Sequence, residues 1–282
     1  MRILMCTDGT PLAENAVSFG ALIAQAGGME VTLLAVYDRA ASAGAEARVR
    51  ASVAQAQSLF PAHAEEKIRI GHAAEQIIAE AESGAYDLLA VGSRGRRGLA
   101  RLLFGSVASR LARYSRIPAL IVKGQRPAIR RVLACTGGDV RGERVARWAG
   151  QIARWLNAEI TVLHVMSQMA LSPQSKLDEL SETAEQAIAQ GTREGKHLSR
   201  ELELLREQEI TANAHPKLRH GLVLEEIVAE ANGGDYDLVI IGAHEAPELP
   251  AGWGWLGGYL VDDVADKIIS AVNRPVLVIR GK

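Results

Sequence analysis

The sequence predicts an α/β protein of two tandem Rossmann-like domains, each built on a five-stranded, parallel, doubly wound sheet. Two observations carry this prediction. Segments of the first half recur in the second half in the same order, and each half alternates short β-branched runs with longer helical patterns. The composition agrees, because 282 residues with 48% hydrophobic and 23% charged side chains suffice for two globular domains.

Four pairs of matching segments establish the duplication. They are RILMCT with RVLACT, VTLLAV with ITVLHV, IIAEAESGAYDLLAVG with IVAEANGGDYDLVIIG, and IPALIV with RPVLVI, which begin at residues 2 and 131, 31 and 160, 77 and 227, and 117 and 274. The offset rises from 129 to 150 between the second and third pairs, so the second half carries about 21 extra residues (150 − 129). A linker with Gly, Gln and Pro at 124–130 predicts domains at 1–125 and 126–282.

The first half has the element pattern of a doubly wound sheet. The expected strands are 2–7, 30–37, 66–70, 86–92 and 119–123, and the expected helices are 11–26, 45–59, 72–83 and 105–116. Continuous apolar strands such as LLAVG fit a parallel sheet covered on both faces, with right-handed crossovers. Ligands of such sheets bind at the carboxyl ends of the strands, which directs attention to the residues after Thr7, Val36 and Val91.

Most of the extra residues of the second half lie within 174–209. This stretch is typical of one long charged helix or of a kinked pair, with weak points at Gly191 and Gly195. A solvated helix that covers the sheet is favoured over a partner-binding arm.

The second half also holds all four tryptophans, Trp148, Trp155, Trp253 and Trp255. Trp148 and Trp155 are seven residues apart and share one helix face. Core or inter-domain packing is the favoured role, and a contact surface built by 249–260 is the alternative.

The turn after the fourth expected strand has the residues of a phosphate-binding loop. Gly92 and Gly95 are followed, after nine residues, by Gly105 and Ser106, where the next helix begins. Glycines allow close approach of the backbone to a phosphate, and the N–H groups of a helix N-terminus attract an anion. Seven arginines and no acidic residue lie between 93 and 116. A tight strand–helix connection beside a solvated basic helix is the alternative, but the combined features favour phosphate.

This G-x2-G-x9-G-S spacing, after a strand and at the start of a helix, resembles the nucleotide-binding motif of the universal stress protein family. TDGT at 7–10, a second strand ending in AVYD and the closing IPALIV extend the resemblance, which covers the chain as two tandem family domains of the adenine nucleotide α-hydrolase-like fold. It implies an ATP site in which Asp8 and Val36 lie against the adenosine. The residues that it assigns to the phosphates are Gly92, Gly95, Gly105, Ser106 and the backbone N–H of Val107. Arg94, within the same loop, is a further candidate ligand.

The resemblance also implies that the last strands, 119–123 and 276–280, pair the two domains with each other, and it leaves dimerisation of the whole chain open. Asp8 has its own rationale, because a carboxylate at a strand end can bond ribose hydroxyls or hold a phosphate-bound metal. A second role for Asp8, capping the helix that begins near Pro11, is compatible with binding.

The second half has lost this motif. The replacements at equivalent positions are Gly137 for Asp8, Glu245 for Gly95, Asp262 for Gly105 and Asp263 for Ser106. Carboxylates at the helix start would satisfy the helix dipole themselves and repel phosphate. Other registers through Gly257 and Gly258 are open, but the losses predict a single nucleotide site, in the first half.

The remaining features narrow the class of protein. A formal net charge of −1 gives no signal for nucleic acid or a membrane surface. The first residues form too short an apolar run for a signal peptide, and no stretch approaches the ~18–20 residues that span a bilayer. Cys6 and Cys135 lie in apolar runs, as reduced buried thiols do. The dinucleotide fingerprint, the P-loop and the G-x-S-x-G nucleophile motif are absent, and the histidines form no metal-ligand pattern.

The sequence therefore predicts a cytoplasmic, ATP-binding protein of the universal stress type. The nucleotide would be a regulatory ligand in a stress response, with a divalent metal such as Mg²⁺ at the phosphates and an unknown protein as downstream partner. No water-activating base is evident beside the loop, so no enzyme activity is expected beyond slow ATP hydrolysis. A slow ATPase of the same fold and a non-catalytic interaction module for another phosphate ligand are the alternatives.

Overall fold

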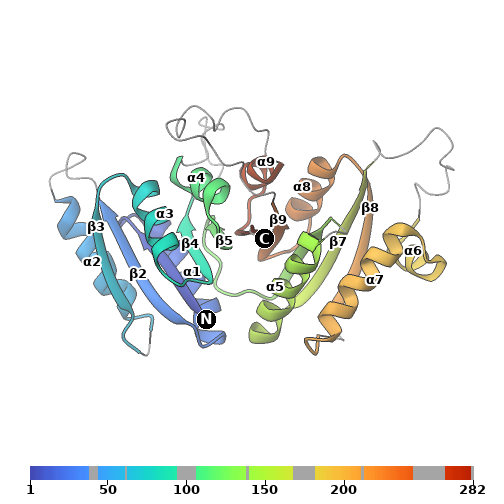
Figure 1. The fold of residues 1–282 in the computed structure, drawn as a ribbon, viewed down its shortest axis with the longest axis horizontal. Coiled ribbons are helices and arrows are strands. Elements are labelled where there is room, and N and C mark those ends of the chain that lie inside the picture. The colour runs from blue at the N-terminus through green and yellow to red at the C-terminus, as the bar shows by residue number, and fades with distance from the viewer. Residues whose placement is uncertain are drawn as a thin grey trace.

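Ten strands form one continuous sheet that runs through both halves of the chain. The computed structural model describes residues 1–37, 44–60, 62–93, 106–137, 140–167, 182–210, 213–243 and 264–280. The strand order is β3-β2-β1-β4-β5-β10-β9-β6-β7-β8. Each half thus repeats the doubly wound order 3-2-1-4-5 with parallel neighbours, as predicted, and we call β1–β5 with its helices the first domain and β6–β10 with its helices the second (Figure 1).

The predicted elements of the first domain are all present. They are β1 (Arg2–Thr7), α1 (Pro11–Ala26), β2 (Glu30–Tyr37), α2 (Ala45–Gln57), β3 (Glu65–Ile70), α3 (Ala73–Ser83), β4 (Leu88–Gly92), α4 (Ser106–Tyr114) and β5 (Ala119–Val122). β4 begins two residues later than the sequence predicts, although the backbone N–H of Asp87 still donates to the carbonyl of Arg2 at 2.9 Å and both side chains before the strand have partners. The Tyr86 hydroxyl donates to Glu80, and the Asp87 carboxylate accepts from the backbone N–H of Arg2.

The second domain repeats this plan with one additional helix. Its elements are β6 (Arg131–Thr136), α5 (Val140–Leu156), β7 (Glu159–Ser167), α6 (Ala184–Gln190), α7 (Arg193–Arg206), β8 (Ala214–Gly221), α8 (Val223–Gly233), β9 (Leu238–Gly242), α9 (Val264–Ala271) and β10 (Val276–Ile279). The extra residues form a kinked helix pair, one of the two predicted alternatives. The break falls at Gly191, which has φ 64°. α7 takes the place of α2, and its Leu198 and Leu205 are buried in the hydrophobic core.

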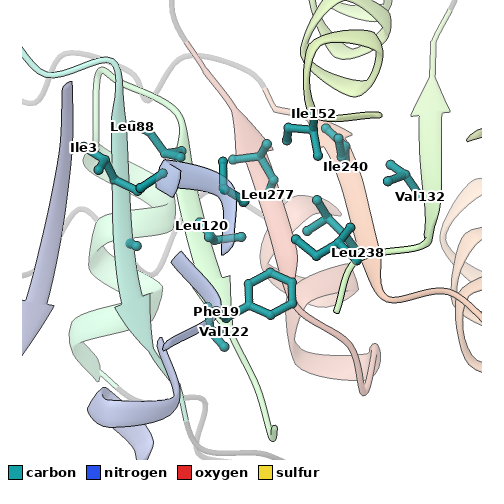
Figure 2. Close-up of a cluster of buried hydrophobic side chains, with 14 of the residues drawn as sticks. Ile3, Phe19, Leu88, Leu120, Val122, Val132, Ile152, Leu238, Ile240 and Leu277 are labelled. Carbon is teal, nitrogen blue, oxygen red and sulfur yellow. The ribbon is translucent and has the colours of Figure 1, made fainter. Parts of the chain in front are cut away.

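Helices cover both faces of the sheet, so its strands are buried from two sides. Along β1, alternate side chains serve opposite faces: Ile3 and Met5 pack with α1 and α2, and Leu4 and Cys6 pack with α3 and α4. The two hydrophobic clusters that result each extend through both domains. Figure 2 shows part of one of them around β5 and β10. The continuous apolar strands of the sequence are explained by this double coverage.

The domains meet where β5 and β10 pair antiparallel. Leu120 lies opposite Leu277, and the flanking pairs are Ala119 with Val278 and Ile121 with Val276. Leu120 and Leu277 are also equivalent residues of the repeat, because both they and the paired prolines are 157 residues apart (277 − 120). A local pseudo-twofold axis therefore passes between them. The expectation that the last strands join the domains is confirmed.

Aromatic packing reinforces this junction. Trp148 and Trp155 on α5 both pack against the core, as predicted. A Cβ atom at Gly27, which follows α1, would lie 3.0 Å from the ring of Trp155, so the indole covers the end of a first-domain helix. Trp253 and Trp255 lie outside the described residues.

Candidate functional site

The turn after β1 lies at the carboxyl end of the first strand, and its carboxylate organises the start of α1. Asp8 Oδ1 accepts hydrogen bonds from the N–H of Thr10 at 3.0 Å and from its hydroxyl at 2.6 Å. Thr10 is the N-cap of α1 and accepts from Ala13 N at 3.4 Å. Asp8 is therefore not the helix cap, and that alternative role was wrong. Its side chain is exposed, and in the described ranges Oδ2 accepts no hydrogen bond.

Two buried hydroxyl groups, of Thr7 and Ser52, hold the same turn against α2. Thr7 Oγ1 lies 2.8 Å from Ser52 Oγ on α2 and accepts from Gly9 N at 3.1 Å. Gly9 has φ 73°, and a Cβ there would lie 2.9 Å from Arg48 Cγ. The turn thus requires glycine for its backbone conformation and for the approach of α2. Asp8 is consequently displayed on a rigid support.

Val36 lies near the end of β2, beside this turn. The last residue of β2 that pairs with β1 is Ala35, opposite Thr7, so Val36 and Tyr37 extend past the end of β1. The Val36 side chain is 4% exposed and belongs to the core on the α3 and α4 side. Only its backbone is therefore available to a ligand near Asp8.

Gly92 brings the end of β4 against the start of α1. A Cβ atom at this position would lie 2.4 Å from the carbonyl oxygen of Leu12 and 3.0 Å from Ala13 N. These are backbone atoms of the first helical turn, which cannot move aside, so only glycine is accommodated here. The sequence assigned Gly92 to phosphate approach, and the structure adds a packing role that brings β4 beside the Asp8 turn.

Ser93 is a candidate site residue that the sequence did not indicate. It is 3% exposed, and its hydroxyl has no hydrogen-bond partner among the described residues. Its backbone N–H donates to the carbonyl of Val122 at 2.9 Å, which holds it at the carboxyl end of the sheet. A buried hydroxyl with no partner calls for an explanation such as a ligand or a loop contact. The position of Ser93 between Gly92 and Gly95 is the feature of the sequence that could have indicated it.

The other predicted phosphate ligands are only partly within the described residues. Arg94, Gly95 and Gly105 lie outside them. Ser106 is the first residue of α4, and Val107 packs partly buried against the core. Because α4 runs antiparallel to the strands, its N-terminus lies at the same edge of the sheet as Asp8 and Gly92.

Three arginines of α4 and of the turn after it face carboxylates from other segments. Arg113 is ion-paired with Asp266 of the second domain, Arg110 lies 3.9 Å from Glu75, and Arg116 lies 3.7 Å from Glu82. The span 93–116 itself holds no acidic residue, as the sequence shows, but the fold brings carboxylates of α3 and α9 to these three arginines. Arg94, Arg96, Arg97 and Arg101 lie outside the described residues.

At the equivalent turn of the second domain, the buried carboxylate of Glu201 lies close to the backbone of α5. Gly137 stands in place of Asp8 and is exposed. Glu201, on α7, is 2% exposed, and its Oε1 lies 2.7 Å from where a Cβ of Gly142 would be. Ala13 is the first-domain equivalent of Gly142, and the buried α2 side chain at the first-domain turn is the smaller Ser52. A larger acid on one helix is thus accommodated by a smaller residue on the other.

Two histidines stack on each other next to Thr136, the last residue of β6. His164 on β7 stacks on His197 of α7 with ring centroids 5.7 Å apart, and its Nδ1 lies 3.1 Å from the carbonyl of Thr136. Burial lowers the pKa of His164, and the neighbouring His197 lowers it further. Ala35 is the equivalent first-domain residue, so this polar cluster is particular to the second domain.

A second feature missed in the sequence is a buried carboxylate that occurs in both domains. Glu80 accepts from Lys67 and Tyr86, each at 2.8 Å, and is ion-paired with Arg69. The equivalent Glu230 accepts from Lys217 at 2.8 Å, Arg219 at 2.9 Å and Tyr236 at 2.7 Å. The signal was the identity of these residues at an offset of 150. The network fixes each edge strand to its covering helix and lies away from the Asp8 turn.

The described residues include two thiols and several side chains of the types that bind metals. Cys6 and Cys135 are free and buried, and burial raises the pKa of both thiols. No three His, Cys, Asp or Glu side chains of the described ranges lie close enough together to hold a metal ion. Each helix in these ranges falls short of what crossing a membrane requires.

Comparison with known proteins assigns the chain to a family. The model of the universal stress protein family matches residues 1–123 and again 128–280. A universal stress protein from Archaeoglobus fulgidus DSM 4304 superimposes with TM-score 0.66 at 16% identity, over 100% of this chain and 98% of that chain. A functionally unknown protein from Pseudomonas aeruginosa PAO1 also gives 0.66, at 17% identity, over 99% and 92%.

These two solved structures are similar to the chain in fold alone, since their identities are low. No functionally curated protein matches the sequence. The family match extends over nearly all of the chain and occurs once in each half, in agreement with the repeated strand order. The chain belongs to the universal stress protein family and carries two of its domains in tandem.

Proposed function

We propose that the first domain binds ATP at the carboxyl ends of β1 and β4 and that the nucleotide acts as a regulatory ligand in a cytoplasmic stress response. The supporting observation is the convergence at this edge. Gly92 packs on the first turn of α1, so the exposed Asp8 carboxylate and the buried Ser93 hydroxyl lie at the same edge of the sheet. Both offer hydrogen-bonding capacity that the described residues do not use.

The chemistry of these groups suits an adenine nucleotide with its metal. Asp8 Oδ2 can accept from ribose hydroxyls or hold a phosphate-bound Mg²⁺, and the backbone of Val36 extends past β1 toward the same place. A bound Mg²⁺ would neutralise part of the triphosphate charge. Ser93 can donate its hydroxyl to a phosphate oxygen, and the α4 N-terminus at Ser106 and Val107 favours an anion. Arg94, Gly95 and Gly105 complete the proposed phosphate contacts.

Isothermal titration with ATP, ADP, AMP and cyclic AMP tests this function. We expect one nucleotide per chain. Asp8→Gly and the double change Gly105→Asp/Ser106→Asp install the residues of the second domain, and each should weaken binding about 100-fold or more because a contact is lost or a repulsive charge added. Gly137→Ala, at the equivalent turn of the second domain, is the matched control and should leave the affinity unchanged.

Two outcomes would contradict the proposal. One is the absence of nucleotide binding by the intact chain, and the other is equal binding by the Gly105→Asp/Ser106→Asp variant. A phosphate-release assay in parallel distinguishes a bound regulatory ligand from a substrate, since steady turnover that Asp8→Gly abolishes would indicate an ATPase instead.

A further inference from the structure

Three histidines of the second domain lie on the face of the sheet that α7 covers. His164 on β7 stacks on His197 of α7, with the ring centroids 5.7 Å apart. His220 on β8 lies two residues beyond Leu218, which pairs with His164 and packs in the same core as α7, so His220 belongs to this face. The His220 Nε2 is buried and has no hydrogen-bond partner among the described residues. Figure 1 shows α7 over the outer part of the sheet, beside β7 and β8.

The first domain has no histidine at the equivalent place. Ala35 is the repeat equivalent of His164 and is fully buried. The two histidines of this domain, His63 and His72, are exposed, and none of the buried residues of its covering helix α2 is titratable. Among the described residues, imidazoles therefore take part in the packing of α7 but not in that of α2.

His164 is held in the fold as a neutral ring. Its Nδ1 lies 3.1 Å from the carbonyl oxygen of Thr136, and because a carbonyl can only accept, Nδ1 carries the hydrogen. Nε2 is therefore the atom that would take up a further proton. His164 is 8% exposed, so the resulting cation would lose most of its hydration in the closed structure.

The groups around this ring do not compensate for that loss. Burial, the largest influence, lowers the pKa of His164 from its ordinary value of 6.5, and His197 and Arg193 of α7 lower it further. The hydrogen bond to Thr136 and the carboxylate of Glu194 act in the opposite direction without reversing the shift. The closed structure therefore resists a proton on His164.

The other charged groups of the neighbouring elements are engaged elsewhere. On α5, Glu143 is ion-paired with Arg200 of α7 at 3.4 Å. The buried carboxylate of Glu201, also on α7, lies close to the backbone of α5. The cations of β8 bind Glu230, on the opposite face of the sheet, and they are Lys217 and Arg219.

α7 is the part of this layer that can move. β7 is hydrogen-bonded to β6 on one side and to β8 on the other. α7 is attached mainly through packed side chains, of which Leu198, Leu204 and Leu205 are fully buried. An element attached by side chains opens at a lower free energy than a strand that is hydrogen-bonded along both edges.

We propose that α7 is a proton-sensitive cover of the second domain: in mild acid, uptake of a proton by His164 releases α7 from β7 and β8 while the rest of the domain stays folded. Release gives the imidazolium access to water and separates it from His197. Because the open form accepts the proton and the closed form resists it, a fall in pH shifts the equilibrium toward the open form. The device belongs to the second domain and does not depend on nucleotide binding.

Hydrogen exchange of the full chain at pH 7.5 and pH 5.5, corrected for the intrinsic exchange rates, tests the proposal. Uptake of one proton by the open form, at the ordinary histidine pKa of about 6.5, should lower the protection of the α7 amides about tenfold over this interval. The amides of α5 should stay better protected than those of α7 at both pH values. Protection of α7 that does not change with pH, or that equals the protection of α5 at pH 5.5, would overturn the proposal.

Two variants identify the titrating group. His164→Leu cannot take up a proton, so the fall in α7 protection should shrink to less than about twofold. His164→Gln gives the same test with a polar side chain if the leucine variant does not fold. His215→Gln is the matched control, because this histidine is exposed on β8, and the fall of about tenfold should remain. A full fall in the His164 variants, or its loss in His215→Gln, would overturn the assignment to His164.

Discussion

Lys123 and Arg280 join the two domains by a reciprocal exchange of hydrogen bonds. They follow β5 and β10 at equivalent positions, and each is 4% exposed. Lys123 Nζ donates to the carbonyl of Ile269 and, at 2.8 Å, to that of Val272. Arg280 Nε donates to the carbonyl of Ala112 on the first-domain helix α4. Each cation thus satisfies backbone acceptors near the C-terminal end of the other domain's helix, where the helix dipole favours positive charge.

Replacing Lys123 by methionine should destabilise the chain by about 2–3 kcal/mol, because the aliphatic stem is kept while buried carbonyls lose a charged donor. Urea unfolding followed by circular dichroism measures the change. Arg116→Met is the control, since the Arg116 side chain is 82% exposed, and it should alter stability by less than about 0.5 kcal/mol. Equal stability of the two variants would show that the exchange contributes nothing.

The duplicated carboxylate predicts sensitivity to acid. Burial raises the pKa of Glu80, but the hydrogen bonds from Lys67 and Tyr86 outweigh it, so the pKa of this carboxyl is held below its ordinary value of 4.5. A depressed carboxyl pKa adds stability that is complete above the unfolded value and is lost as pH falls through the folded value. The free energy of unfolding should therefore decline below about pH 4.5 in the wild-type chain.

Glu80→Gln should cost about 3 kcal/mol at pH 7, because it leaves the cations Lys67 and Arg69 without their buried partner, and it should flatten the acid limb of the stability curve. Urea titrations at pH 3.5, 5 and 7 distinguish the two effects. Glu82→Gln, whose carboxylate is 48% exposed, should reproduce neither. If the free energy of unfolding fell as steeply at low pH in Glu80→Gln as in the wild type, other carboxyl groups would be responsible for the loss.

The strands could be predicted from the sequence, but the side-chain networks that join distant segments could not. Strands, helices and the duplication follow from apolar runs and repeated segments, which are local signals. The partners of α4 are not local: Arg113 and Asp266 are 153 residues apart, and no count of charges between 93 and 116 could reveal that pair. The alternative capping role of Asp8 failed for a local reason, because Thr10, two residues further on, is a second capping residue and occupies the N-cap.

The histidine pair predicts a second pH effect in a different range. The pKa of His164 is lowered by burial and by His197, against its ordinary value of 6.5, so the neutral form is the one the fold stabilises. This contribution is complete above about pH 6.5 and is lost as the pH falls through the folded value. His164→Leu removes the titration and should flatten the stability curve between pH 7 and pH 5. His215→Gln, at an exposed position of β8, should leave the slope unchanged.

The two glycines of the helix pair α6–α7 should differ in how much stability is lost when a methyl group is added. A Cβ at Gly195 would lie 1.9 Å from the carbonyl oxygen of Ala187, a backbone atom of α6, so Gly195→Ala must force α6 and α7 apart. We expect a loss of about 3 kcal/mol. Gly191 has open space around it and a φ of 64°, so Gly191→Ala should cost only about 1 kcal/mol of backbone strain.

Urea unfolding of both variants measures the difference, and tryptophan fluorescence reports on the second domain because Trp148 and Trp155 lie on α5, against which α7 packs. The ranking matters more than either value. If Gly191→Ala were the more damaging change, the corner would be held by its turn rather than by the contact between the helices. With the predicted ranking, the close contact at Gly195 is what keeps α7 over β7 and β8, and Glu201 with it, at the turn where Gly137 stands in place of Asp8.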